Sequence, residues 1–487
     1  MIIIMNHSNI SVVINGCMKL DRGLRQTLCD SYNRCHNARH EWISKGPIRC
    51  FRSFQYRRQT HKDGDTVLPS PQEVTITLRK NEFNKEFTYG VIKSYDSNQL
   101  ASNDPIEDTR SEAQCKLTPG LLMGVFDGHG GPACAQVIAK RLFKYIAASL
   151  LPTNLLESIQ RQEATENLIE TFNDKADIVQ DLKLIYEDSF HKYLNLLKLR
   201  QQEDVNVQTC LEKSILHLDN DLSREVLEPY KTNGVINHKT LTVALSGAVA
   251  CVAYIDGPHL YVANVGDCNA VLGTMTEENE FLSKKITKEH NSENLNELKR
   301  IWNEHPENER NTIIRRDRLL GELAPLRSLG DFRYKWPADV IGKLAVTSFG
   351  NRAIPAHYHT PPYLTAKPDV FYHRLTPKDK FLIIASDGIW DMMTPLESVK
   401  LVGEHMKGKV FFNPLKLPRK NIQLGDINEL LSHRKESLKS KPKDMNAATH
   451  LIRHAIGGTE YGVDHSRLAH LLSLSPDGVL KYDIGHR

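Results

Sequence analysis

Two apolar runs, far apart in the chain, end in the same Asp-Gly step, and they constrain the fold more than any other feature. LLMGVFDG covers residues 121–128 and KFLIIASDG covers residues 380–388. Continuous apolar runs of this length, bounded by turn residues, are typical of strands buried on both faces. Each strand therefore carries a carboxylate, Asp127 or Asp387, to its C-terminal end. There the carboxylate can meet a metal ion, a phosphate-bearing ligand or only the next turn.

The rest of the chain comes in blocks of strands and blocks of helices. Small and β-branched residues over 241–273 predict two or three consecutive antiparallel strands, with a tight turn at 256–258. Weak alternation over 72–98 predicts strands that open the folded part, and helical spacing after Pro132 predicts a helix packed on the strand before it. Residues 152–228 read as helical throughout. Such blocks favour an α+β layered domain over a strictly alternating one.

The composition excludes several classes of protein. The chain is 40% apolar and 25% charged, as in ordinary globular proteins, and a run of 18 apolar residues that could span a membrane does not occur. A formal net charge of +4 gives no argument for nucleic acid. The nine cysteines form no CxxC pair, which indicates reduced thiols in a non-secreted protein.

The charge is uneven in two segments, and these define the predicted domain organisation. Residues 1–62 hold eleven Lys or Arg against three acids, which is typical of a mitochondrial transit peptide, the alternative being a basic disordered tail. We predict one folded domain over 72–487. Within it, residues 407–443 hold ten Lys or Arg against three acids and predict a basic surface insertion, either a solvated loop or a docking site for an acidic partner.

Other acidic residues occupy similar places. Asp267 follows the run YVANVG, and Glu107 and Asp108 lie in a loop before the first Asp-Gly strand. Carboxylates brought together would repel one another strongly unless a divalent cation neutralised them. Oxygen ligands without Cys or His favour Mg²⁺ or Mn²⁺ over zinc. Because an isolated Asp-Gly step is usually just a turn, spacing alone leaves both interpretations open.

At this point the sequence resembles the metal-dependent, PP2C-like serine/threonine protein phosphatases. The resemblance rests on GVFDGHGG (124–131), SGAVACVAYI (246–255), LYVANVGD (260–267), RSLGD (327–331) and ASDGIWD (385–391). Longer segments, such as YDSNQLASNDPIED (95–108) and DRLLGELAPLRSLGDFRYKW (317–336), are similar to the pyruvate dehydrogenase phosphatase branch of that family. The resemblance implies an α+β sandwich of two antiparallel β-sheets flanked by α-helices, with a binuclear metal site between the sheets.

The resemblance also implies a set of metal ligands. They would hold two Mg²⁺ or Mn²⁺ ions, bridged by Asp127, and a weaker third ion. The implied ligands are Asp127, the carbonyl of Gly128, Glu107, Asp108, Asp387, Asp267 and Asp391.

The implied chemistry is direct hydrolysis of a phosphate ester. A water activated at the metal pair attacks phosphorus without a phosphoenzyme, and His129, beside Asp127, protonates the departing serine oxygen as general acid.

The chain departs from the wider family at three places. The phosphate-gripping arginine of the family corresponds to Asn103, a feature shared with the pyruvate dehydrogenase phosphatases, so Asn103 is the substrate-contact candidate. The family's GDSRA is here GDCNA, with Cys268 and Asn269. The family's last strand, which opens with an aspartate ligand, has no clear counterpart, and Tyr482 or Asp483 stands near its place.

We therefore expect a phosphatase that removes phosphate from serine on the E1 component of the pyruvate dehydrogenase complex, in the mitochondrial matrix. The lipoyl-bearing E2 core and a regulatory subunit are further partners that the resemblance suggests. Two alternatives stay open. One is a general PP2C-like phosphatase with another substrate, and the other is a catalytically impaired binding module that has lost the last ligand.

Overall fold

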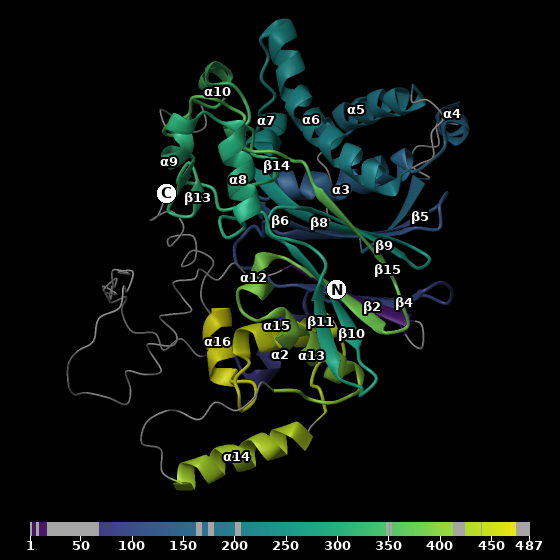
Figure 1. The fold of residues 1–487 in the computed structure, drawn as a ribbon, viewed down its shortest axis with the longest axis vertical. Helices are drawn as coiled ribbons and strands as arrows, with labels where there is room; N and C mark the ends of the chain where they lie inside the picture. Colours follow the sequence, from purple (N-terminus) through teal and green to yellow (C-terminus); the bar gives the residue numbers. More distant parts are fainter. Residues whose placement is uncertain are drawn as a thin grey trace, which may run out of the picture.

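A computed structural model describes residues 2–5, 9–16, 68–161, 168–173, 180–199, 206–346, 350, 353–412, 424–439 and 441–473. Two seven-stranded sheets lie face to face, and helices cover both outer faces (Figure 1). This four-layer arrangement confirms the predicted α+β sandwich.

The first sheet is antiparallel throughout and holds the first Asp-Gly strand at its centre. Its order is β15 (Asp369–Arg374), β9 (His259–Val265), β8 (Gly247–Asp256), β6 (Leu121–His129), β5 (Thr109–Cys115) and β7 (Ile169–Phe172), with the short β14 (Leu329–Gly330) also paired to β8. Residues of β6 and β8 are buried on both faces, as the apolar runs predict.

The second sheet holds the other Asp-Gly strand, β16. Its order is β11 (Phe281–Lys285), β10 (Asn269–Met275), β16 (Asp379–Ala385), β1 (Ile2–Met5), β2 (Asn9–Gly16), β4 (Ile92–Gln99) and β3 (Phe83–Glu86). Its pairs are antiparallel except for β2 and β4, which run parallel. A separate hairpin is formed by β12 (Ile314–Arg315) and β13 (Arg318–Leu319).

Three buried clusters hold the layers together. The cluster between the sheets takes alternate residues from each strand, for example Met123 and Val125 of β6 and Ile384 of β16. The opposite side of the first sheet packs on α3 (Ala133–Ser149), α4 (Thr153–Arg161), α5 (Gln180–Lys198), α6 (Val207–Asn233), α7 (His238–Leu245), α8 (Leu295–Glu304), α9 (Arg310–Ile313) and α10 (Ala338–Leu344). The short 3-10 turns η2 (Glu307–Glu309) and η3 (Phe332–Tyr334) lie among them.

The outer face of the second sheet packs on a separate group of helices. They are α2 (Pro71–Arg79), α12 (Asp387–Trp390), α13 (Pro395–Met406), α15 (Ala447–Gly457) and α16 (His465–Ser473). Among the helices that the structure describes, none is long and apolar enough to cross a membrane.

One predicted strand is a helix. The weak alternation of VTITL is wrong as a strand signal, because α2 covers it. Ser70 caps the helix in a reciprocal capping box with Glu73, and Pro71 takes the first turn, where its missing N–H costs nothing. Val74 and Leu78, four residues apart, are the two fully buried positions, so helical spacing decides the burial.

Among the described residues of 152–228, the prediction of helix is wrong at one place. Residues Ile169–Phe172 form β7, an edge strand that pairs with β5 from Glu112 to Cys115. Its first and last residues are buried while the two between are exposed, a pattern too short to be distinguished from a helical turn by sequence alone.

The basic insertion 407–443 also contains an element that the loop prediction lacks. Helix α14 spans Leu424–Lys439 and lies apart from the sandwich, at the lower edge of Figure 1. Arg434 ties it to the body, because its guanidinium donates to the carbonyls of Phe412 and Glu460.

The first two strands fall inside the segment predicted as a basic tail. Strand β1 pairs with β16 from Ile2–Ile383 to Ile4–Phe381 and also with β4. The prediction of a transit peptide or basic tail over 1–62 stays a prediction, because the rest of that segment lies outside the described residues. Tyr482 and Asp483 lie outside them as well.

Candidate functional site

The alternation of β6 decides where its carboxylate goes. Leu121, Met123 and Val125 all face the core between the sheets, so Asp127 continues on that face. Its backbone stands opposite Val249 of β8, and its side chain is 1% exposed. Asp127 is thus held in the inter-sheet layer by its pairing with β8, one residue beyond the last pair of β6 with β5 at Phe126.

Three of the predicted carboxylates act electrostatically on one buried thiol, that of Cys268. This thiol is fully buried in the inter-sheet core between β9 and β10. Burial raises the pKa of Cys268 well above its ordinary value, and the negative charges of Asp127, Asp267 and Asp387 raise it further. Three predicted residues that are more than 100 positions apart in the chain therefore influence the same buried thiol.

The loop before β5 supplies a second group. The carboxylate of Glu107 accepts two hydrogen bonds of 2.6 Å, from the side-chain amide of Asn103 and from the backbone N–H of Gly131. Gly128 packs so closely on this loop that a Cβ there would lie 2.4 Å from the carbonyl oxygen of Glu107. A glycine is required at 128 for this approach, which sets Glu107 beside the end of β6.

Asp108 and Asp391 attach to the element that carries Asp387. Asp108 is buried, and its carboxylate accepts a 3.3 Å hydrogen bond from Ser386, the N-cap of α12. Asp391 is the C-cap of the same helix, and its N–H donates to the carbonyl of Asp387 at 2.7 Å. Since residues four apart share a helix face, Asp387 and Asp391 point the same way.

His129, at the end of β6, contacts a carboxylate that the sequence reasoning did not single out. Its Nε2 lies 2.6 Å from Oδ2 of Asp331, and the hydroxyl of Ser328 donates to the same oxygen at 2.6 Å. Asp331 is the last residue of the motif RSLGD, and that motif is the sequence signal that could have pointed to it. Its φ of +51° is a left-handed conformation, which is uncommon for a residue other than glycine.

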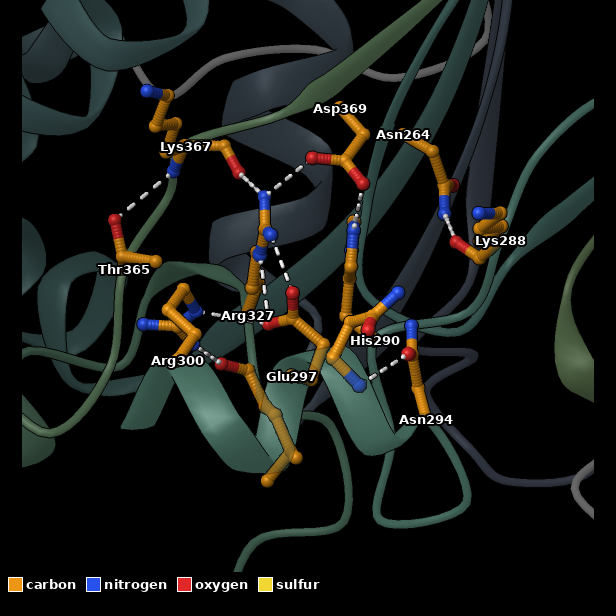
Figure 2. Close-up of polar contacts among 12 residues, drawn as sticks. Asn264, Lys288, His290, Asn294, Glu297, Arg300, Arg327, Thr365, Lys367 and Asp369 are labelled. Atoms are coloured by element: carbon orange, nitrogen blue, oxygen red, sulfur yellow. Dashed lines mark hydrogen bonds and ion pairs between the residues drawn. The ribbon is translucent and has the colours of Figure 1, made fainter. Parts of the chain in front are cut away.

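A buried polar network supports the loops that carry these groups. We call it the Arg327 network; its members are Arg327, Glu297, Arg300, Asp369 and His290. Figure 2 shows the guanidinium of Arg327 between the carboxylates of Glu297 and Asp369. It forms two bonds with Glu297, of 2.9 and 2.5 Å, and one of 3.0 Å with Asp369.

The far end of this network reaches the loop that carries Asp267. His290 Nε2 lies 3.2 Å from Asp369, while its Nδ1 accepts the N–H of Gly266 at 3.0 Å. The His290 contact and the Arg327 charge, outweighing burial, lower the pKa of Asp369 to about 2. The network thus joins residue 266, beside Asp267, to residue 327, four positions before Asp331.

The donor set fits a hard divalent cation. Carboxylate and carbonyl oxygens are the ligands that Mg²⁺ and Mn²⁺ prefer. Among the described residues, no three His, Cys, Asp or Glu side chains form a preformed metal cage. Mg²⁺ does not need one, because it usually keeps several waters and takes one or two carboxylates.

The comparison with protein families gives the class. The sequence pattern of the family described as protein phosphatase 2C matches residues 102–458. The chain belongs to the protein phosphatase 2C family, whose members are phosphoprotein phosphatases that generally depend on Mg²⁺ or Mn²⁺.

Within this family, the chain is similar to two mitochondrial pyruvate dehydrogenase phosphatases. The chain is 41% identical over 434 residues to pyruvate dehydrogenase (acetyl-transferring) phosphatase 1, mitochondrial, of Rattus norvegicus, covering 83% of this chain and 79% of the relative. It is 39% identical over 442 residues to phosphatase 2, mitochondrial, of Homo sapiens, covering 87% and 83%. A solved structure, the serine-threonine phosphatase 2C from Toxoplasma gondii, aligns with a TM-score of 0.34 at 16% identity over 62% of this chain and 79% of that one. A likeness at that level carries no argument.

Proposed function

We propose that this chain hydrolyses phosphoserine on the E1 component of the pyruvate dehydrogenase complex, in the mitochondrial matrix, and so reactivates the complex. The observation that supports the chemistry is the packing of the Glu107 loop on Gly128, which sets the Glu107 carboxylate beside the end of β6, where Asp127 is buried. The substrate is supported by the 41% and 39% identity with the two mitochondrial pyruvate dehydrogenase phosphatases.

Two Mg²⁺ or Mn²⁺ ions would be held by oxygen atoms from the end of β6, from the loop before β5 and from α12. We assign them Asp127, the carbonyl of Gly128, Glu107, Asp108 and Asp387, with Asp267 and Asp391 for a weaker third ion. When bound, the ions supply Lewis acidity toward the phosphoryl group and the attacking water. The protein holds its carboxylates in place through β6, through the Glu107 bonds and through α12.

His129 would act as the general acid. It stands two residues after Asp127, at the end of the same strand, and can give a proton to the serine oxygen as the phosphorus–oxygen bond breaks. General acid catalysis is typically worth about 10²–10⁴-fold.

Asn103 bears on how the substrate is held. Its amide is neutral and already donates to Glu107, so it offers a phosphate less than a charged arginine would. We therefore propose that affinity depends on protein–protein docking, with E1, the lipoyl-bearing E2 core and a regulatory subunit as the partners.

The test is metal-dependent release of phosphate from a phosphoserine peptide of E1. We expect activity with Mn²⁺ or Mg²⁺, loss with a chelator, and loss of at least about 100-fold in Asp127→Asn. The matched control is Asp256→Asn, the same exchange at the other end of the first sheet, which should keep full activity. A folded parent chain without metal-dependent activity would reject the proposal and favour a binding module without catalysis.

A further inference from the structure

The contact between His129 and Asp331 depends on a gap in the strand between them. Strand β8 lies between β6 and β14, and Gly247 pairs with His129 on one side and with Gly330 on the other. A Cβ on Gly247 would lie 2.0 Å from Oδ2 of Asp331 and 2.2 Å from Nε2 of His129. The two side chains therefore meet over Gly247, and a larger residue there would separate them.

The carboxylate of Asp331 is fixed before it reaches His129. Asp331 is 4% exposed, and the hydroxyl of the fully buried Ser328 donates to the same oxygen that contacts the imidazole. Its backbone N–H donates to the carbonyl of Ser246 at 3.0 Å, and its φ of +51° is a left-handed conformation that a β-branched residue would avoid. An aspartate held this way has little freedom to leave the imidazole.

A buried ion pair from the helical layer locks the same loop. Asp219 of α6 accepts the N–H of Gly330 at 2.8 Å and pairs with Lys335 at 2.9 Å. Lys335 also donates to the carbonyl of Ser328 at 2.9 Å. Both ends of the turn that carries Asp331 are thus tied to one carboxylate of α6.

We propose that Asp331 is a positioning residue for His129. It engages Nε2 of the imidazole across Gly247 and so assigns proton transfer to the other ring nitrogen, Nδ1. This inference rests on the proposed function, in which His129 is the general acid. The arrangement of an acid or base oriented by a fixed carboxylate is a recurrent one in hydrolases.

The step balances as follows. The oxygen of water forms the new bond to phosphorus, and the bond between phosphorus and the serine oxygen breaks with its electron pair on that oxygen. Nδ1 of His129 gives its proton to the serine oxygen, and the proton released by the attacking water returns to the ring through solvent. Asp331 stays a carboxylate throughout.

The experiment compares two leaving groups. A serine alkoxide needs a proton to depart, whereas 4-nitrophenolate, the leaving group of 4-nitrophenyl phosphate, is stable without one. Asp331→Asn has the same shape and tolerates the left-handed conformation, so it is suited to the test. We expect it to lower kcat on an E1 phosphoserine peptide by at least about tenfold, with KM within about twofold, and kcat on 4-nitrophenyl phosphate within about threefold.

Two further comparisons separate positioning from other roles. In a His129→Gln background, Asp331→Asn should cause no further loss beyond about twofold, because both changes remove one function. The Mn²⁺ concentration for half activity should not move, which it would if Asp331 were a ligand. The control is Glu322→Gln, which removes the negative charge paired with Arg333 on the same segment without touching His129 and should retain full activity.

Equal losses on both substrates, an additive double variant or a raised Mn²⁺ requirement would overturn the inference. If Asp331→Asn does not fold, Ser328→Ala removes just the supporting hydroxyl and should give the same selective loss, about threefold, on the peptide. A parent chain inactive on both substrates would reject the proposed function itself, and this inference with it, whereas an active parent with substrate-independent losses would reject this inference alone.

Discussion

Replacing Arg327 by methionine should lower the free energy of unfolding by about 3 kcal/mol, because it leaves a buried carboxylate with half of its partners. Glu297 is 3% exposed and receives two bonds from Arg327 and one of 3.0 Å from Arg300. Removing one partner of a buried ion pair costs about 3–5 kcal/mol, and the remaining Arg300 places this case at the lower end. Asp369 is 39% exposed, so its lost bond adds little.

The measurement is urea unfolding followed by tryptophan fluorescence, with the change read from the midpoint at constant slope. The matched control is Arg300→Met, the same exchange at the other partner of Glu297. Arg300 is 20% exposed, so we expect a loss below about 1 kcal/mol. Adding Glu297→Met to Arg327→Met should restore at least half of the loss, since a buried pair can be replaced by apolar side chains at little cost. Equal losses for Arg327→Met and Arg300→Met would refute the reasoning.

The same network should shape the acid side of the stability curve. Burial raises the pKa of Glu297, but the bond and charge of Arg327, with Arg300, outweigh it and leave the pKa lowered. The pKa of Asp369 is lowered to about 2, first by His290 and then by Arg327, against burial. A carboxylate whose pKa is lower in the folded state stabilises above its unfolded pKa, and this is lost as pH falls through the folded pKa. We therefore expect stability to fall between about pH 4 and 2, and less steeply in Arg327→Met.

Three further predictions test other parts of the account. Gly247→Ala should lower the free energy of unfolding by about 1–3 kcal/mol and abolish peptide hydrolysis, because its Cβ enters the space between His129 and Asp331. The control is Gly425→Ala, where a Cβ meets nothing within 4 Å, and it should change neither stability nor hydrolysis. Ile3→Pro should lower the unfolding midpoint of the full chain, because β1 pairs with both β16 and β4 and a strand inside a sheet does not accept proline. An unchanged midpoint would show that β1 adds no stability. Mn²⁺ at 100 times its Kd should stabilise the chain by about 2.7 kcal/mol in thermal unfolding, and Asp127→Asn should reduce this gain; equal gains in both would remove Asp127 from the ligand set.

The parts of the fold that the sequence predicts are those with a strong local signal. The runs before Asp127, Asp267 and Asp387 are strands, and their apolar side chains are buried on one face between the sheets and on the other against the helices. The opening segment misleads for a local reason. Ser70, Pro71 and Glu73 are helix-start residues, and their capping box decides a segment whose β-branched alternation indicates a strand.

The functional site also has a part that the sequence predicts and a part that it does not. Alternation along β6 places Asp127 in the inter-sheet layer with Met123 and Val125. Asp267 and Asp387 come after β9 and β16 have ended, at Val265 and Ala385, so the alternation of those strands does not direct their side chains. The partner of His129 does not follow from alternation either, because Asp331 comes from a turn 202 residues away and reaches the imidazole through the gap at Gly247. No periodicity in the sequence encodes that contact, since it depends on how β14 pairs with β8.

The central claim is tested most directly by reactivation of phosphorylated pyruvate dehydrogenase complex. The inactive, phosphorylated complex is incubated with the chain and Mg²⁺ or Mn²⁺, and both the phosphoserine content of E1 and the recovered dehydrogenase activity are followed. The account predicts that phosphate loss and recovery proceed together, require the metal, and are absent with Asp127→Asn. Metal-dependent activity on phosphoserine peptides without any dephosphorylation of the complex would contradict the proposed substrate.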